Sequence, residues 1–344
     1  MIERLAIYLT VIGMALVFAG VWSHRGPIWA QDTVVSRAVE DETLLTRRGT
    51  ILEWRGGEVV IDSVGGPKRI PTARVVEFHT TWQPSYMRAR QLIDQRQLLE
   101  AAPHLAKAIE EEPRAWARHI IRADLTRCLH LSGQDLTAAQ HFIELIDEDS
   151  QTRFLWTIPL AWGTTSQDPH LLSAAKSWLG ASHPAISLLG ASWLLSSPER
   201  PAALNVLEEL SRDIDPQIAH LASAQIWQTQ WVSADARQLE RWLTQIERMP
   251  WEIRPGPRHI AAETLARQGR SSDALLEWMK TVILNGDQYR LGLTALERSA
   301  TILAEQGDSR AARRLHEEIV RDFPGTAAAN QSLMWLNRSL HKED

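Results

Sequence analysis

Small residues and helix-ending residues recur at helical spacing along two long stretches of the chain, and this pattern constrains the fold most strongly. Ala89 and Ala101 stand where the two helices of one hairpin would cross closely, and Ala108 stands where the second helix would meet the next hairpin. Pro113 would end that helix, because proline lacks an amide hydrogen and clashes with the preceding turn. The same order returns in three further sets, which predict four helical hairpins in all: Leu129, Gly133, Ala138, Phe142 and Leu145; Ala262, Leu265, Gly269, Ala274 and Trp278; and Ala300, Leu303, Gly307, Ala312, Ile319 and Pro324.

This pattern resembles the tetratricopeptide repeat, a pair of antiparallel helices with a period of about 34 residues. The resemblance covers residues 82–150 and residues 255–340, and the second stretch includes a C-terminal helix. Thr126, Thr281 and His316 depart from the small or apolar residues that the family usually has at those positions. The resemblance implies stacked hairpins and a groove that holds a protein segment, and it carries over no catalytic residue.

Residues 166–250 follow a different helical pattern. Asp168-Pro169, His183-Pro184 and Asp215-Pro216 each begin an apolar helical stretch. Proline is favourable in the first turn of a helix, because the amide hydrogen that it lacks would be unpaired there. The apolar residues after the second and third pairs repeat at one constant offset, first as Ile186, Leu189 and Leu194 and then as Ile218, Leu221 and Ile226. This pattern resembles HEAT-type helical pairs.

We therefore expect a mainly α fold: a right-handed α-solenoid of tetratricopeptide-like and HEAT-like hairpins, preceded by a small β-meander. In such an array each unit contacts only its neighbours. Pro250, Pro255 and Pro257 predict a rigid joint between two halves of the solenoid. If the joint separates the halves, the first half should fold without residues 257–344.

Residues 43–80 predict the β module. Short β-branched runs are separated by Gly56-Gly57 and Gly65-Gly66, which suit tight hairpin turns. Their spacing predicts a meander of three to four strands that resembles small SH3-like or Sm-like barrels. So small a sheet is not stable alone. We expect it to dock on the following helices or on a partner in the cell envelope.

The amino terminus predicts export. An uncharged apolar run over residues 5–22 follows a short charged start and precedes a Gly-Pro breaker and the small residue Ala30. This order is typical of a secretory signal occupying residues 1–30. An uncleaved anchor is the alternative, because the apolar run is just long enough to span a membrane. Either way we expect the body of the protein in the periplasm or cell envelope, with membrane contact through residues 5–22 if they are retained.

Composition excludes several classes of protein. With 44% hydrophobic and 23% charged residues the chain is neither wholly disordered nor a polytopic membrane protein. The net charge of −5 argues against nucleic-acid binding as the main function. Cys128 is the single cysteine, so an intramolecular disulfide and a cysteine-built metal site are excluded.

The sequence predicts no catalytic activity and no cofactor. It contains no His-Glu-x-x-His metal motif, no phosphate-binding loop ending in Gly-Lys-Ser/Thr and no Gly-x-Ser-x-Gly elbow. The histidines are scattered along the chain. Cys128 lies in an apolar helical stretch, which favours a small core residue over a nucleophile.

Tryptophan is unusually frequent, with 15 residues against 5 Phe and 3 Tyr. Trp227 and Trp231 are one helical turn apart and would share a face. Their apolar neighbours favour packing between helices. In the alternative interpretation the pair lines a concave groove and stacks on a peptide, a proline or a sugar ring, which makes these two tryptophans the candidate partner-binding residues.

These features together predict a non-catalytic exported scaffold that binds another envelope protein or peptide through a helical-repeat groove. One alternative is a purely structural subunit of an envelope complex. The other is a glycan-binding protein or an enzyme whose site is built by the tryptophans of residues 166–250.

Overall fold

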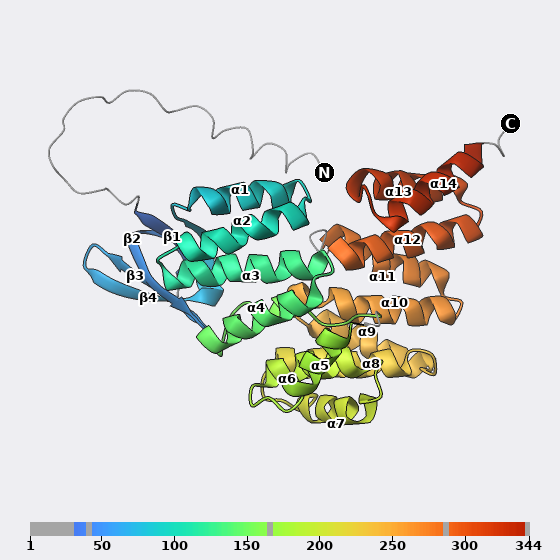
Figure 1. Cartoon of the computed structure of the whole chain (residues 1–344), viewed down its shortest axis with the longest axis horizontal. Coiled ribbons are helices and arrows are strands. Elements are labelled where there is room, and N and C mark those ends of the chain that lie inside the picture. The colour runs from blue at the N-terminus through green and yellow to red at the C-terminus, as the bar shows by residue number, and fades with distance from the viewer. Residues whose placement is uncertain (1–30, 39–42, 164–167, 285–288, 341–344) are drawn as a thin grey trace.

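The computed structural model describes residues 31–38, 43–163, 168–284 and 289–340. The expected signal or anchor in residues 1–30 lies outside this part of the chain. The described chain is mainly helical, with one small antiparallel sheet ahead of the helices (Figure 1). The mainly α class and the β module at the amino-terminal side are therefore confirmed. None of the described helices is long and apolar enough to cross a membrane.

The sheet has five antiparallel strands in the order β4-β3-β2-β1-β5. Their bounds are β1 Asp32–Arg37, β2 Leu44–Arg55, β3 Glu58–Ser63, β4 Gly66–Pro71 and β5 Val75–His79, with a short 3-10 turn at Thr72–Arg74 before β5.

This sheet is larger than the three to four strands expected within residues 43–80. β1 precedes that range, and β5 returns to pair with β1, placing Val34 opposite Phe78. The sheet is thus not a simple meander. β1 has only 6 residues, so the alternation of its side chains does not by itself identify a strand. It forms a strand because β2 and β5 pair with it, one on each side.

The inner face of the sheet docks on the helices. Val34, Ile51, Val59 and Ile61 are buried there, and they form one cluster with Trp116. The Trp116 indole nitrogen donates a hydrogen bond to the Ile51 carbonyl oxygen at 3.0 Å. The helices therefore supply the surface that so small a sheet needs.

The helices form three groups. The first arm contains α1 Pro84–Asp94, α2 Leu98–Glu111, α3 Ala115–Leu131 and α4 Asp135–Glu148. The middle layer contains α5 Pro169–Trp178, α6 Pro184–Leu194, α7 Arg200–Leu210, α8 Pro216–Gln230 and α9 Ala236–Arg248. The second arm contains α10 Pro255–Arg267, α11 Ser271–Leu284, α12 Tyr289–Glu305, α13 Ser309–Asp322 and α14 Ala327–Leu340.

The chain doubles back on itself. Figure 1 shows the first arm and the second arm side by side, with the middle layer below them. Side-chain contacts join the arms: Arg290 of α12 pairs with Asp135 of α4, and Arg96 after α1 lies over the ring of Phe323 after α13. A simple array in which each hairpin touches only its neighbours has no such contacts.

The turns inside the hairpins share one backbone conformation. Gly133, Gly269 and Gly307 have φ values of 83°, 77° and 83°, in the left-handed region that glycine adopts without steric cost. The first hairpin has Arg96 at the corresponding position, with φ 60°, and it is the one non-glycine residue with positive φ in the described chain. The cost of this conformation for a residue with a side chain is about 1–2 kcal/mol.

The expected joint at residues 250–257 does not separate two cores. Pro255 and Pro257 lie in the first turn of α10, and Pro250 follows α9. α10 packs on α8 and α9, and Ile253 and Ile260 belong to the same buried cluster as the middle layer. The first half therefore shares its core with α10, and the prolines start a helix rather than mark a boundary.

Candidate functional site

A stretch of the chain between the first arm and α5 is packed among the helices of the middle layer. Residues 158–163, which we call the internal segment, follow the 3-10 turn Leu155–Thr157 and belong to no helix or strand. Ile158, Leu160 and Ala161 are buried in the main core. The first four residues of the segment therefore lie among the helices, whereas Trp162 is partly buried and Gly163 is exposed.

Helix α6 holds this segment by its backbone. The indole nitrogen of Trp193 donates to the Pro159 carbonyl oxygen at 2.9 Å. The amide of Ala161 donates to the Ser192 hydroxyl at 2.9 Å. Both helix residues are buried, so each bond also satisfies a polar group that would otherwise be costly inside the core.

Helix α8 also binds the backbone of the internal segment. Gln228 donates through Nε2 to the Ala161 carbonyl oxygen at 2.9 Å and accepts from the Gly163 amide at 2.7 Å. Gln225, which is fully buried, donates to the same carbonyl oxygen at 3.2 Å. Polar side chains that fix the backbone of an extended segment are the usual way in which a groove holds a peptide. Here contacts of this kind bind the backbone of the chain's own internal segment.

The two candidate tryptophans pack in the same core as the internal segment. Trp227 is 5% exposed, and its ring stacks on Trp242 with 5.1 Å between ring centroids. Trp231 caps the C-terminal end of α8 and is partly buried against the same core. These positions favour the core-packing interpretation for Trp227, while Trp231 keeps part of its ring at the surface.

His259 of α10 is buried beneath the internal segment. A Cβ atom on Gly163 would lie 3.1 Å from its Nε2 atom, and its Nδ1 atom has no hydrogen-bond partner among the described residues. Burial, followed by the nearby charge of Arg298, lowers the pKa of His259 from 6.5 to about 4. The imidazole is therefore neutral at physiological pH.

Acid is expected to destabilise the protein through His259. The unfolded chain takes up a proton on His259 near pH 6.5, and the folded chain does so only near pH 4. The stability that the neutral imidazole contributes is therefore fully present above pH 6.5 and is lost as the pH falls towards 4. At pH 5 the loss is about 2 kcal/mol. Urea denaturation at pH 7 and pH 5 measures this loss in the free energy of unfolding. His259→Gln should reduce the difference between the two pH values, and an equal difference in the variant contradicts the assignment.

An open cleft lies between the two arms. Its cavity has a volume of about 490 Å³ and is lined on one side by Arg96–Glu100 and Ser132–Gly133 of the first arm. Arg290 and Pro324–Thr326 of the second arm line the other side. We call this the inter-arm cleft. It is built from hairpin turns and helix ends, and the internal segment does not enter it.

Arg290 crosses from one arm to the other at the floor of the cleft. Its Nη1 atom donates to both carboxylate oxygens of Asp135, at 2.9 and 3.1 Å, and to the His130 carbonyl oxygen at 3.4 Å. Asp135 also contacts the Nδ1 atom of His130 at 2.7 Å. Burial opposes ionisation, yet His130 and Arg290 together hold the pKa of Asp135 below its ordinary value. Asp135 is therefore a stable anionic anchor for Arg290.

The described residues offer no metal-binding cluster, and the Cys128 thiol and the Ser332 hydroxyl are both buried. No cluster of three or more His, Cys, Asp or Glu residues among them could hold a metal ion. Burial raises the pKa of the Cys128 thiol to about 12, so it stays protonated and is a poor nucleophile. His316 contacts the Ser332 hydroxyl at 3.0 Å, but Ser332 is 2% exposed, which leaves little access for a substrate.

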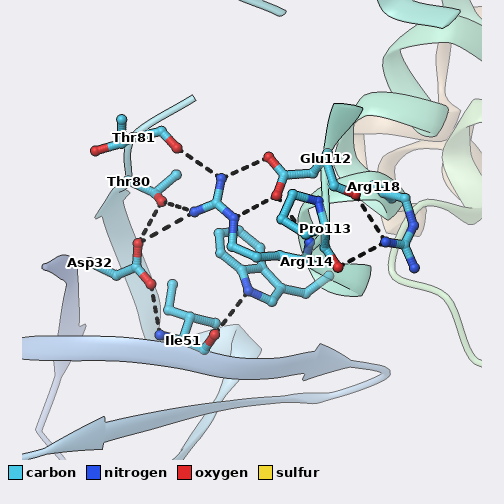
Figure 2. Close-up of polar contacts among 9 residues, drawn as sticks. Asp32, Ile51, Thr80, Thr81, Glu112, Pro113, Arg114 and Arg118 are labelled. Atoms are coloured by element: carbon cyan, nitrogen blue, oxygen red, sulfur yellow. Dashed lines mark hydrogen bonds and ion pairs between the residues drawn. The ribbon is translucent and has the colours of Figure 1, made fainter. Parts of the chain in front are cut away.

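A polar network joins the β module to the first arm, as Figure 2 shows. The Arg114 guanidinium donates to both carboxylate oxygens of Glu112, at 2.7 and 2.8 Å, and to the Thr80 hydroxyl at 2.6 Å. Thr80 in turn donates to Asp32 of β1, whose other oxygen accepts from the Ile51 amide. This network is a structural junction, because its acidic partners are buried and already paired.

No protein-family model, no curated protein and no solved structure matches the chain.

Proposed function

We propose that the protein is a non-catalytic exported scaffold of the periplasm or cell envelope. In this proposal it is a right-handed α-solenoid of tetratricopeptide-like and HEAT-like hairpins, and it binds a segment of another envelope protein or a peptide. The observation that carries the proposal is the inter-arm cleft of about 490 Å³, which the internal segment does not enter. The internal segment instead lies among the helices of the middle layer, where α6 and α8 bind its backbone.

The chemistry of the cleft supports a peptide ligand. Leu98, Leu99 and Pro324 give it apolar walls, and Arg96 and Arg290 give it hydrogen-bond donors. Leu99 is 60% exposed, so one wall offers an apolar surface to a partner. Apolar contacts with a few placed polar groups suit the recognition of an extended segment.

Site-specific photo-crosslinking in the native cell tests this function. A photoreactive phenylalanine analogue replaces Leu99 in the cleft, and in a matched control it replaces Ile214, which is 99% exposed in the turn between α7 and α8. We expect a discrete protein adduct from position 99 and none of the same mass from position 214. Identical adducts at both positions, or none at position 99, would contradict the proposal.

A further inference from the structure

We propose that the inter-arm cleft recognises an acidic extended segment of its protein partner through Arg96 and Arg290. This inference rests on the proposed function and adds the charge of the partner to it. Three independent features of the cleft carry it: a strained arginine, an arginine with unused donors, and an uncapped helix start.

The backbone of Arg96 is the first feature. The other three hairpins have glycine at this position, and Arg96 adopts the same left-handed conformation with φ 60°. Backbone strain that persists at a cleft is typical of functional residues. Glycine at position 96 would remove the strain and keep the turn. The hairpin geometry therefore does not require the arginine side chain.

The Arg96 guanidinium stands at the cleft with its donors available. It lies 5.5 Å from the centre of the Phe323 ring, and among the described residues it makes no hydrogen bond or ion pair. Asp322, whose charge interacts with that of Arg96, is engaged by Arg321 at 2.7 and 2.9 Å. Arg321, more than Arg96, holds the pKa of Asp322 below its ordinary value. Asp322 is therefore already paired and leaves Arg96 for another anion.

Arg290 is the second feature. Its contacts with Asp135 and with the His130 carbonyl oxygen all use the Nη1 atom. The Nε and Nη2 atoms donate no hydrogen bond within the described chain, and the side chain is 32% exposed in the cleft. The planar guanidinium has five N–H groups and suits a carboxylate. Asp135 thus positions Arg290 and leaves donors for a ligand.

The start of α2 is the third feature. Gln97 precedes the helix and makes no side-chain capping bond, so the amides of residues 98–100 lack partners inside the helix. These three residues belong to the lining of the cleft. The helix dipole also favours an anion at this end. Among the described residues of the lining, Glu100 is the one acidic side chain, against the two arginines. The nearby Leu99 adds an apolar contact.

The test uses the full chain and a fluorescein-labelled eight-residue peptide that alternates glutamate with leucine or glycine. Two matched peptides carry glutamine or lysine in place of glutamate. Fluorescence anisotropy should show the acidic peptide binding about tenfold or more tightly than either, since charged hydrogen bonds are lost in both controls. Affinity should fall as salt rises. Equal binding of the three peptides, or no binding by the acidic one, overturns the inference.

Arg96→Gly separates a ligand role from a structural role. The variant should keep the melting temperature within about 2 °C, because it relieves strain while adding chain entropy. Its affinity for the acidic peptide should fall about tenfold, and Arg290→Gln should have a similar effect. Arg310→Gln, an exposed arginine of α13 outside the cleft, is the matched control and should leave affinity unchanged. Unchanged affinity in Arg96→Gly and Arg290→Gln overturns the inference.

The two proposals fail in different ways. If position 99 still crosslinks a partner in cells and the yield is unaffected by Arg96→Gly, the scaffold function stands and the acidic preference is wrong. If position 99 captures nothing, the cleft is not the binding site and both proposals fall.

Discussion

Replacing Trp227 with alanine is expected to lower the free energy of unfolding by about 3–5 kcal/mol. The ring is 5% exposed, it stacks on Trp242, and it belongs to the largest buried cluster of the described chain. Removing it leaves a cavity that the helices of the middle layer close only in part, since these helices are also tied to the internal segment. Urea denaturation followed by circular dichroism measures the loss.

Trp231→Ala is the matched control for Trp227→Ala. Trp231 lies one turn further on at the end of α8 and is only partly buried, so we expect a loss of about 1 kcal/mol. The sequence alone predicted that the two would behave alike if they shared a buried face. A loss below about 1 kcal/mol for Trp227→Ala, together with weaker partner binding, would restore the groove interpretation.

The helices were predictable because their signals are local. Proline at a helix start, as at Pro184 and Pro216, and glycine in a hairpin turn, as at Gly133 and Gly307, act within a few residues of the chain. The structure has helices starting at both prolines and left-handed turns at both glycines. Local chemistry thus sets the helix boundaries with little help from the rest of the fold.

The sheet and the closure of the arms were not predictable in the same way. β1 becomes a strand because β2 and β5 pair with it from opposite sides, and β5 lies about forty residues later in the sequence. The contact between Arg290 and Asp135 joins residues of different arms. Neither contact leaves a periodic signal, so a repeat pattern predicted a continuous array where the chain doubles back.

The residues of the candidate site also differ in whether the sequence could predict them. Arg96 carried a signal, since aligning the four hairpin turns shows arginine where the other three have glycine. Arg290 carried none, because its role depends on Asp135 in the other arm. The tryptophans drew attention by their number, yet a large aromatic residue is as well suited to a core as to a groove. The burial of Trp227 and its stacking on Trp242 favour the core.

Replacing Arg114 with alanine is expected to lower the free energy of unfolding by about 3–5 kcal/mol, because breaking a buried ion pair from one side leaves the other charge unpaired. The partner left behind is Glu112, which is 2% exposed and receives two hydrogen bonds from the guanidinium. Arg114 also links Thr80 and, through it, Asp32 of β1 (Figure 2). The variant therefore weakens the attachment of the whole β module.

Arg118→Ala is the matched control, since Arg118 comes from the same helix and donates to the carbonyl oxygens of Glu112 and Pro113 without pairing with a buried carboxylate. We expect it to lose about 1 kcal/mol or less. In Arg114→Ala, limited proteolysis should cut first within residues 43–80, because a five-stranded sheet without its docking surface unfolds before the helices. Adding Glu112→Gln to Arg114→Ala should recover part of the stability, because it removes the unpaired charge. If Arg114→Ala costs no more than Arg118→Ala, and Glu112→Gln recovers nothing, then the network in Figure 2 does not hold the module in place, and the aromatic contacts of Trp116 alone do.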